Sequence, residues 1–136
     1  MSSNKNYRIK SDIFKIANRV YSELSPACGK QVYMDALEAE FSAAGYFHAE
    51  RNPSLPVFYK GKTLGHATEA DFRVFDRALV FVFVTGKIRA PERSAIYRRA
   101  VATGYDMVFI LNFGKSDPEF FRVYVNEKGF NNGTAV

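Results

Sequence analysis

Seven consecutive apolar residues at positions 78–84 limit what this chain of 136 residues can fold into. Valine and phenylalanine alternate through most of the run, and β-branched and aromatic residues favour an extended strand. Because no position of the run is polar, neither face of such a strand suits contact with water. We therefore expect residues 79–84 to form a strand at the centre of a sheet that is covered on both sides.

Helical spacing of apolar residues marks the regions before and after this strand. A first helix is expected over residues 13–24, and either Ser11 or Asp12 can cap its start. Another is expected to follow the central strand, because Pro91 suits the first turn of a helix and Gly104 suits its end. These two helices would cover parts of the sheet.

A helix is also expected over residues 31–44, where Gly45 provides a stop. Its apolar residues follow the spacing of a helix that packs one side against a core. The positions expected to be buried are Val32, Met34, Leu37, Phe41 and Ala44.

The remaining strands are expected where the apolar period becomes two and turn residues lie between the runs. Gly61, between two lysines, marks one turn, and Asp76 with Arg77 marks another. The expected strands cover residues 57–59, 66–75, 79–84, 107–111 and 120–125.

The resulting element order is ααβββαββ, which predicts one α/β (α+β) domain with a mixed central sheet flanked by helices. We expect the domain to cover residues 11–126, after an N-terminal extension at 1–10 and before a flexible tail at 127–136. With 47% of the residues apolar, the chain can bury a core of its own.

Composition also limits the compartment in which we expect the protein and the kinds of site that it can form. Cys28 is the single cysteine, which excludes an internal disulfide framework and a cysteine-based zinc site. No apolar run approaches the roughly 18–20 residues that span a membrane. We therefore expect a cytoplasmic protein that does not insert into membranes.

The net charge of +5 is concentrated in one segment, residues 87–99. Glu92 is the only acid there, and a solvated helix face explains such clustering as readily as nucleic-acid binding does. The candidate nucleic-acid-binding residues are Lys87, Arg89, Arg93, Arg98 and Arg99.

Four short stretches resemble the GxxExxY family of small PD-(D/E)xK-superfamily proteins. They are VYSEL at residues 20–24, VYMDAL at 32–37, VFYKGKTLG at 57–65 and LNFG at 111–114. Their order and spacing carry a resemblance over about residues 13–125. It implies a restriction-endonuclease-like fold and a nuclease site in which carboxylates hold Mg²⁺ and a lysine assists.

The chain departs from that family at the positions that carry the chemistry. At the motif Gly-x-x-Glu-x-x-Tyr stand Ala27, Lys30 and Tyr33, so the acid has become a base. Asp71 matches the first acid of the core motif, but Phe81 and Phe83 stand where a Glu-x-Lys is required. The glutamine usual in the following helix would fall near Ala95. We therefore expect no catalytic residues and no cofactor, with Mg²⁺ needed only if some nuclease activity persists.

The two phenylalanines are expected to lie against the surviving acids. If the hairpin turns at Asp76, position 71 faces 81 and position 69 faces 83 on one side of the sheet. Glu69 and Asp71 would then be relics of a metal site, with Phe81 and Phe83 filling the pocket. In the plainer interpretation Asp71 makes a hydrogen bond and Glu69 is solvated.

Three functions stay open on these observations. The favoured one is an inactive nuclease-like scaffold that binds a protein partner or a second copy of itself. The next is a nucleic-acid-binding domain that uses the basic segment and accessible tyrosines such as Tyr59, Tyr97 or Tyr105. The last is a residual nuclease in which Glu38 or Glu40 joins Glu69 and Asp71 around a metal.

Overall fold

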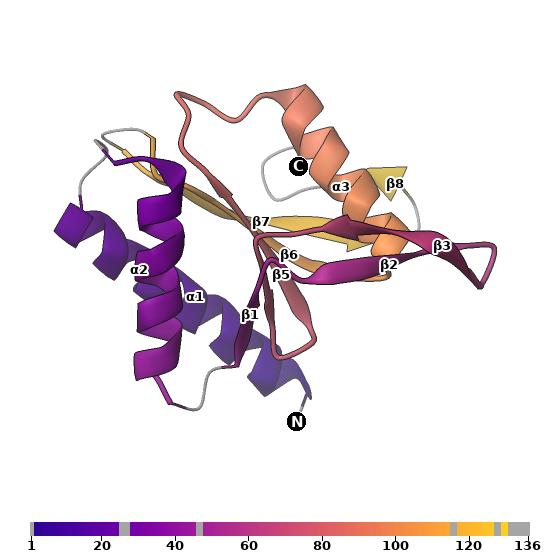
Figure 1. The fold of residues 1–136 in the computed structure, drawn as a ribbon, viewed down its shortest axis with the longest axis horizontal. Coiled ribbons are helices and arrows are strands. Elements are labelled where there is room, and N and C mark those ends of the chain that lie inside the picture. The colour runs from indigo at the N-terminus through magenta and orange to yellow at the C-terminus, as the bar shows by residue number, and fades with distance from the viewer. Residues whose placement is uncertain (1, 25–27, 46–47, 115–116, 127–128, 131–136) are drawn as a thin grey trace.

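The computed structural model describes the chain except for residues 1, 25–27, 46–47, 115–116, 127–128 and 131–136. A six-stranded mixed sheet in the order β1-β4-β5-β6-β7-β8 forms its centre, and β2 and β3 form a separate hairpin (Figure 1). The strands are β1 (Ala49–Arg51), β2 (Ser54–Tyr59), β3 (Lys62–Glu69), β4 (Phe72–Val74), β5 (Ala78–Phe83), β6 (Met107–Asn112), β7 (Glu119–Asn126) and β8 (Gly129–Phe130).

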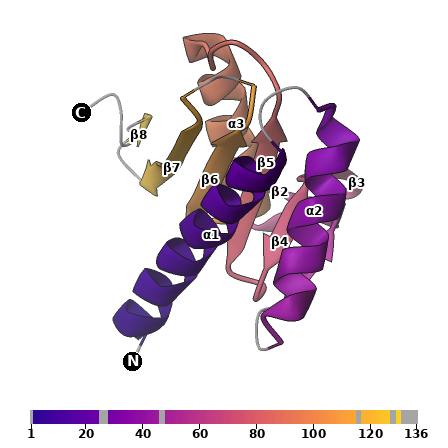
Figure 2. The ribbon, with the colours of Figure 1, turned by 90° about the vertical axis from the view of Figure 1, so that its left-hand side faces the viewer.

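The helices α1 (Ser2–Leu24) and α2 (Lys30–Ala43) lie side by side on one face of this sheet (Figure 2). The helix α3 (Ala90–Thr103) lies on the other face and links β5 to the parallel strand β6. A parallel pair needs such a crossover, because a tight turn can join only antiparallel strands. The prediction of one mixed domain with a central sheet between helices is confirmed.

The central strand is β5, as its apolar sequence predicts. It pairs with β4 in antiparallel and with β6 in parallel fashion, and its first five residues are buried. Val80 and Val82 belong to the core under α1 and α2, whereas Leu79 and Phe81 belong to the core under α3. Alternate side chains therefore pack into two separate cores, which explains why both faces of the strand are apolar.

Both N-terminal helices differ in detail from the expectation. The helix α1 begins at Ser2 rather than at Ser11 or Asp12, and Ile9 is buried with the rest of its apolar stripe. In α2 the aromatic Tyr33 is buried, whereas Val32, expected in the core, is 45% exposed. The helix is rotated so that Tyr33, Met34, Leu37 and Phe41 share its inner side.

The segment expected to be one strand over residues 66–75 is divided. Its first part continues β3, which begins earlier, at Lys62, and pairs with β2. The chain then bends at Asp71 and re-enters as β4 beside β5. The short strands β1 and β8 were not predicted, and β8 lies within the region that we expected to be a flexible tail.

The hairpin of β2 and β3 extends past α3, away from the main sheet (Figure 1). Its turn contains Lys60 and Gly61, both with positive φ, as the lysine-flanked glycine predicts. Most residues of β3 are exposed. Among the described residues, no helix is both long enough and apolar enough to cross a membrane.

Candidate functional site

A cleft of about 750 Å³ opens where α2 begins, β5 ends and α3 makes its first turns. Its lining includes three carboxylates, two cations and an apolar floor. These residues are Glu69, Asp71, Glu92, Lys30, Arg99, Phe81 and Phe83. The structure therefore brings into one cleft the candidate relic acids, the two phenylalanines and one arginine of the basic segment.

Asp71 is held on both of its carboxylate oxygens. Oδ2 accepts a hydrogen bond from the backbone N–H of Val82 at 2.6 Å, and Oδ1 lies 3.1 Å from Nζ of Lys30. The Asp71 side chain is 16% exposed, and the bend it occupies is fixed by the hydrogen bond from its own N–H to the carbonyl of Val80. Because the ammonium and the N–H occupy the two oxygens, this carboxylate is satisfied without a metal.

The register between β4 and β5 is the one expected for this hairpin. Phe72 pairs with Val80 and Val74 with Ala78, so position 71 lies next to Phe81. The turn itself comprises Phe75 and Asp76, both with positive φ.

The predicted pairing of positions 69 and 83 is wrong. Glu69 belongs to β3 and pairs with Ser54 in the hairpin. It nevertheless lies in the same cleft as Phe83, because β3 ends there before the chain bends.

The two phenylalanines form part of the floor of the cleft and leave it open. Phe81 is 4% exposed, and the Arg99 guanidinium lies over its ring with Cζ 5.5 Å from the centroid. Phe83 is half-buried and packs against the core under α3. The expectation that the rings fill the pocket is therefore corrected: they line a cleft large enough for a side chain or a small ligand.

The resemblance implies a Mg²⁺ ion, and the described residues do not fit one. Hard divalent cations need several oxygen ligands, whereas Phe81 and Phe83 offer none. The suggested third ligands are held elsewhere, since Glu38 bonds to Arg51 at 2.9 Å and Glu40 to Arg19 at 2.8 Å. Within the described part of the chain, no group of three His, Cys, Asp or Glu side chains is arranged to hold a metal.

Residues that match the family in the quoted stretches serve packing. The ring of Tyr33 stacks on Phe113, with centroids 4.6 Å apart and planes 9° apart. Asn112 is fully buried, and its Oδ1 accepts hydrogen bonds from the backbone N–H groups of Thr85 and Gly114, each at 3.1 Å. Ala27, at the glycine position of the motif, lies outside the described residues.

The basic segment does not form one patch. Arg93 lies over the ring of Phe121 in β7, with Cζ 4.7 Å from the centroid, and Arg99 lies over Phe81 in the cleft. The other three members are exposed: Lys87, Arg89 and Arg98. Arg93 and Arg99 both contact aromatic rings of the protein and are only partly exposed, so the fully exposed cations are fewer than the sequence count suggests.

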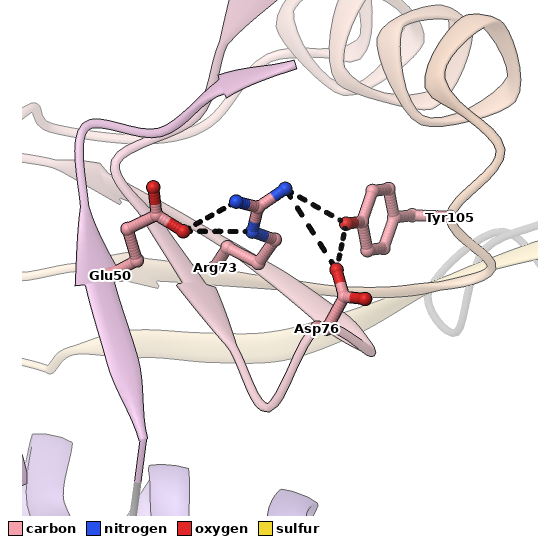
Figure 3. Close-up of polar contacts among 4 residues, drawn as sticks. All are labelled: Glu50, Arg73, Asp76 and Tyr105. Carbon is pink, nitrogen blue, oxygen red and sulfur yellow. Dashed lines mark hydrogen bonds and ion pairs between the residues drawn. The ribbon is translucent and has the colours of Figure 1, made fainter. Parts of the chain in front are cut away.

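A second hollow, of about 700 Å³, is lined by residues of β1, β4 and the β4–β5 hairpin turn. There Arg73 binds Glu50 through Nε at 3.1 Å, and Tyr105 donates a hydrogen bond to Asp76 at 2.9 Å (Figure 3). Arg73 Nη1 also lies 3.4 Å from the Tyr105 hydroxyl. These contacts tie β1, β4, the turn and the end of α3 together. Sequence reasoning missed them because it did not predict β1.

Two phenols are expected to make the stability of the protein depend on pH. Burial is the largest cause that raises the pKa of Tyr105 and of Tyr33 above the ordinary 10.0. The folded chain then holds these protons more tightly than the unfolded chain, so stability is complete below about pH 10 and declines above it. We expect the free energy of unfolding in urea to fall as the pH rises above about 10, and to fall less in Tyr105→Phe. The control is Tyr59→Phe, because Tyr59 is 59% exposed in the folded chain. An equal change in both variants would contradict the assignment.

Sequence reasoning also missed the partner of Asp71. Lys30 stands 41 residues earlier, in a segment noted only for having lost an acid. The signal was present, because one motif position had exchanged a negative for a positive charge while Asp71 stayed negative. Only the packing of α2 against the sheet shows that the two positions meet.

The comparisons with known proteins agree with this architecture. The chain matches no curated protein and no solved structure. A family match extends over residues 7–123, which includes most of α1, all of α2, the hairpin, the cleft and most of β7. By that match, the chain belongs to the PD-(D/E)XK nuclease superfamily.

Proposed function

We propose that this domain is a catalytically inactive nuclease-like scaffold that acts by binding another protein. The observation that carries the proposal is the ion pair between Lys30 and Asp71 at 3.1 Å. By the resemblance, Lys30 stands at a glutamate position and Asp71 at a metal-ligand position. A tethered ammonium thus supplies the positive charge that a divalent ion would supply in a nuclease.

The two phenylalanines at the floor of the cleft support the proposal that the domain is catalytically inactive. Hydrolysis of a phosphodiester needs an activated water and stabilisation of negative charge in the transition state. Phe81 and Phe83 can neither ligate a metal nor exchange a proton. Their rings instead give the cleft an apolar surface, and such surfaces bind side chains of other proteins.

The charges around the cleft favour a protein over a polyanion. Glu69, Asp71 and Glu92 outnumber the two cations that line it. A nucleic acid brings several phosphates close together, and each carboxylate repels them. A protein segment presents fewer charges and both signs, so it suits a cleft of this kind. The partner is another protein or a second copy of this chain.

The test is cleavage of single-stranded and double-stranded DNA and RNA with Mg²⁺ or Mn²⁺, with Asp71→Ala run alongside. We expect no cleavage by either protein, and no saturable heat when Mn²⁺ is titrated into the wild type. Cleavage by the wild type that is lost in Asp71→Ala would overturn the proposal in favour of a residual nuclease with displaced ligands. A mass that rises with concentration in sedimentation would identify the partner as a second copy.

A second candidate is nucleic-acid binding away from the cleft, which the tip of the β2–β3 hairpin favours. Tyr59 is 59% exposed there, and Nζ of Lys60 lies 5.3 Å from the centre of its ring, with Lys62 directly opposite Tyr59. Exposed aromatic rings beside cations are the usual means of holding bases and phosphates. Binding that weakens steeply with salt and is lost in Lys60→Gln with Lys62→Gln, but not in Lys15→Gln on α1, would support this function.

A further inference from the structure

We propose that the cleft receives a carboxylate side chain of the partner protein, bound by Arg99, beside an apolar side chain that packs on Phe83. This inference rests on the proposed function, since it names the chemistry that the partner must present. It assigns Arg99 a role different from that of the exposed cations of the same segment.

Arg99 lies against an aromatic ring of the cleft. Its guanidinium lies over the Phe81 ring, with Cζ 5.5 Å from the ring centre, and Phe81 itself is 4% exposed and belongs to the core under α3. The Phe81 ring has no lone pair to accept a hydrogen bond, so this cation–π contact leaves the N–H donors of the guanidinium available for a ligand. A planar fork of donors matches a carboxylate in two-point geometry.

These donors are not used elsewhere in the described structure. Among the described residues, the Arg99 side chain forms no ion pair and no hydrogen bond, and the contact with Phe81 is its one specific interaction. The other cation of the cleft is already engaged, because Lys30 pairs with Asp71. Arg99 is thus the cation of the cleft that remains to bind an anion.

The other residues that line the cleft indicate which partner side chain would bind next to the carboxylate. Phe83, Val84, Ala95 and Ile96 lie around the same cleft and provide apolar surface. Glu69 and Glu92 limit the negative charge that the cleft accepts. One carboxylate next to an apolar or aromatic side chain satisfies both conditions, whereas a chain of phosphates does not.

The experiment uses two matched peptides, N-acetyl-Phe-Glu-amide and N-acetyl-Phe-Gln-amide, titrated into the isotope-labelled full chain and followed by NMR. We expect saturable shifts of the amides of Val82, Phe83 and Thr85 and of the Arg99 side-chain N–H with the glutamate peptide. The glutamine peptide should bind about tenfold more weakly, because it lacks the charge-assisted hydrogen bonds. Arg99→Gln should remove this difference between the peptides.

The matched control is Arg98→Gln, which removes a cation of the same helix that is exposed and does not line the cleft. It should keep the preference for glutamate. Equal binding of both peptides, loss of the preference in Arg98→Gln, or no binding of either peptide would overturn the inference. Equal binding within the cleft would leave the protein-binding function standing. Cleft shifts with a short oligonucleotide, in the absence of peptide binding, would overturn both.

Discussion

Replacing Gly114 with alanine is expected to lower the free energy of unfolding by about 3 kcal/mol or more, or to prevent folding. A Cβ at this position would lie 2.3 Å from the backbone nitrogen and 2.4 Å from the backbone oxygen of Thr85. Backbone atoms cannot rotate away as a flexible side chain can. The two segments are also held together by Asn112, whose Oδ1 accepts hydrogen bonds from both Thr85 and Gly114.

Gly86→Ala provides the matched control, because it lies one residue from Thr85 and a Cβ there meets no atom within 4 Å. Its free energy of unfolding should stay within about 0.5 kcal/mol of the wild type. Urea unfolding followed by circular dichroism measures both. If Gly114→Ala were as stable as Gly86→Ala, the close approach of the two backbones would be wrong.

Tyr33→Ala is expected to cost about 3–5 kcal/mol, the range for removing a large buried aromatic side chain. Tyr33 has no exposed surface and stacks on Phe113, which in turn packs edge-on against Phe120. Truncation would open a cavity between α2 and the end of β6, where the neighbouring rings are already fixed. The phenol also forms a hydrogen bond with the backbone of Cys28. Tyr33→Phe loses this hydrogen bond but keeps the ring, so it should retain most of the stability.

The adjacent Val32 is the control for this prediction, since it lies on the same helix and is 45% exposed. Val32→Ala should change the free energy of unfolding by about 0.5 kcal/mol or less. The apolar pattern alone places Val32 in the core. Comparing Val32→Ala with Tyr33→Ala therefore tests which side of α2 faces the core. A larger loss for Val32→Ala than for Tyr33→Ala would show that the helix faces the other way.

Much of the fold follows from patterns within single segments. The uninterrupted apolar run of β5 predicts a central strand, and Pro91 with Gly104 predicts the limits of α3 within a residue. The elements that were missed or divided are short or depend on a distant partner. The strand β1 has three residues and exists because it pairs with β4, and the break at Asp71 exists because β3 leaves the sheet to pair with β2.

Only the part of the candidate site that depends on local sequence was predicted. The resemblance names Asp71, Phe81 and Phe83, and the register of one hairpin places Asp71 and Phe81 together. The charge count assigned Arg99 to a basic surface, and the resemblance assigned Lys30 to a lost motif, because neither residue shows its partner in the local sequence. Both lie in the cleft with Asp71 and Phe81.

The sequence by itself determined the mixed architecture, the buried position of β5 and the absence of a Glu-x-Lys pair from residues 81–83, since each depends on the residues present in one segment. Tertiary structure alone decided that Lys30 pairs with Asp71 and that Arg99 lies over the Phe81 ring in an open cleft. Side chains on separate elements interact only after those elements pack, and the energy of an ion pair depends on a separation that the order of residues does not specify. What the cleft can bind is therefore a property of the assembled helices and sheet.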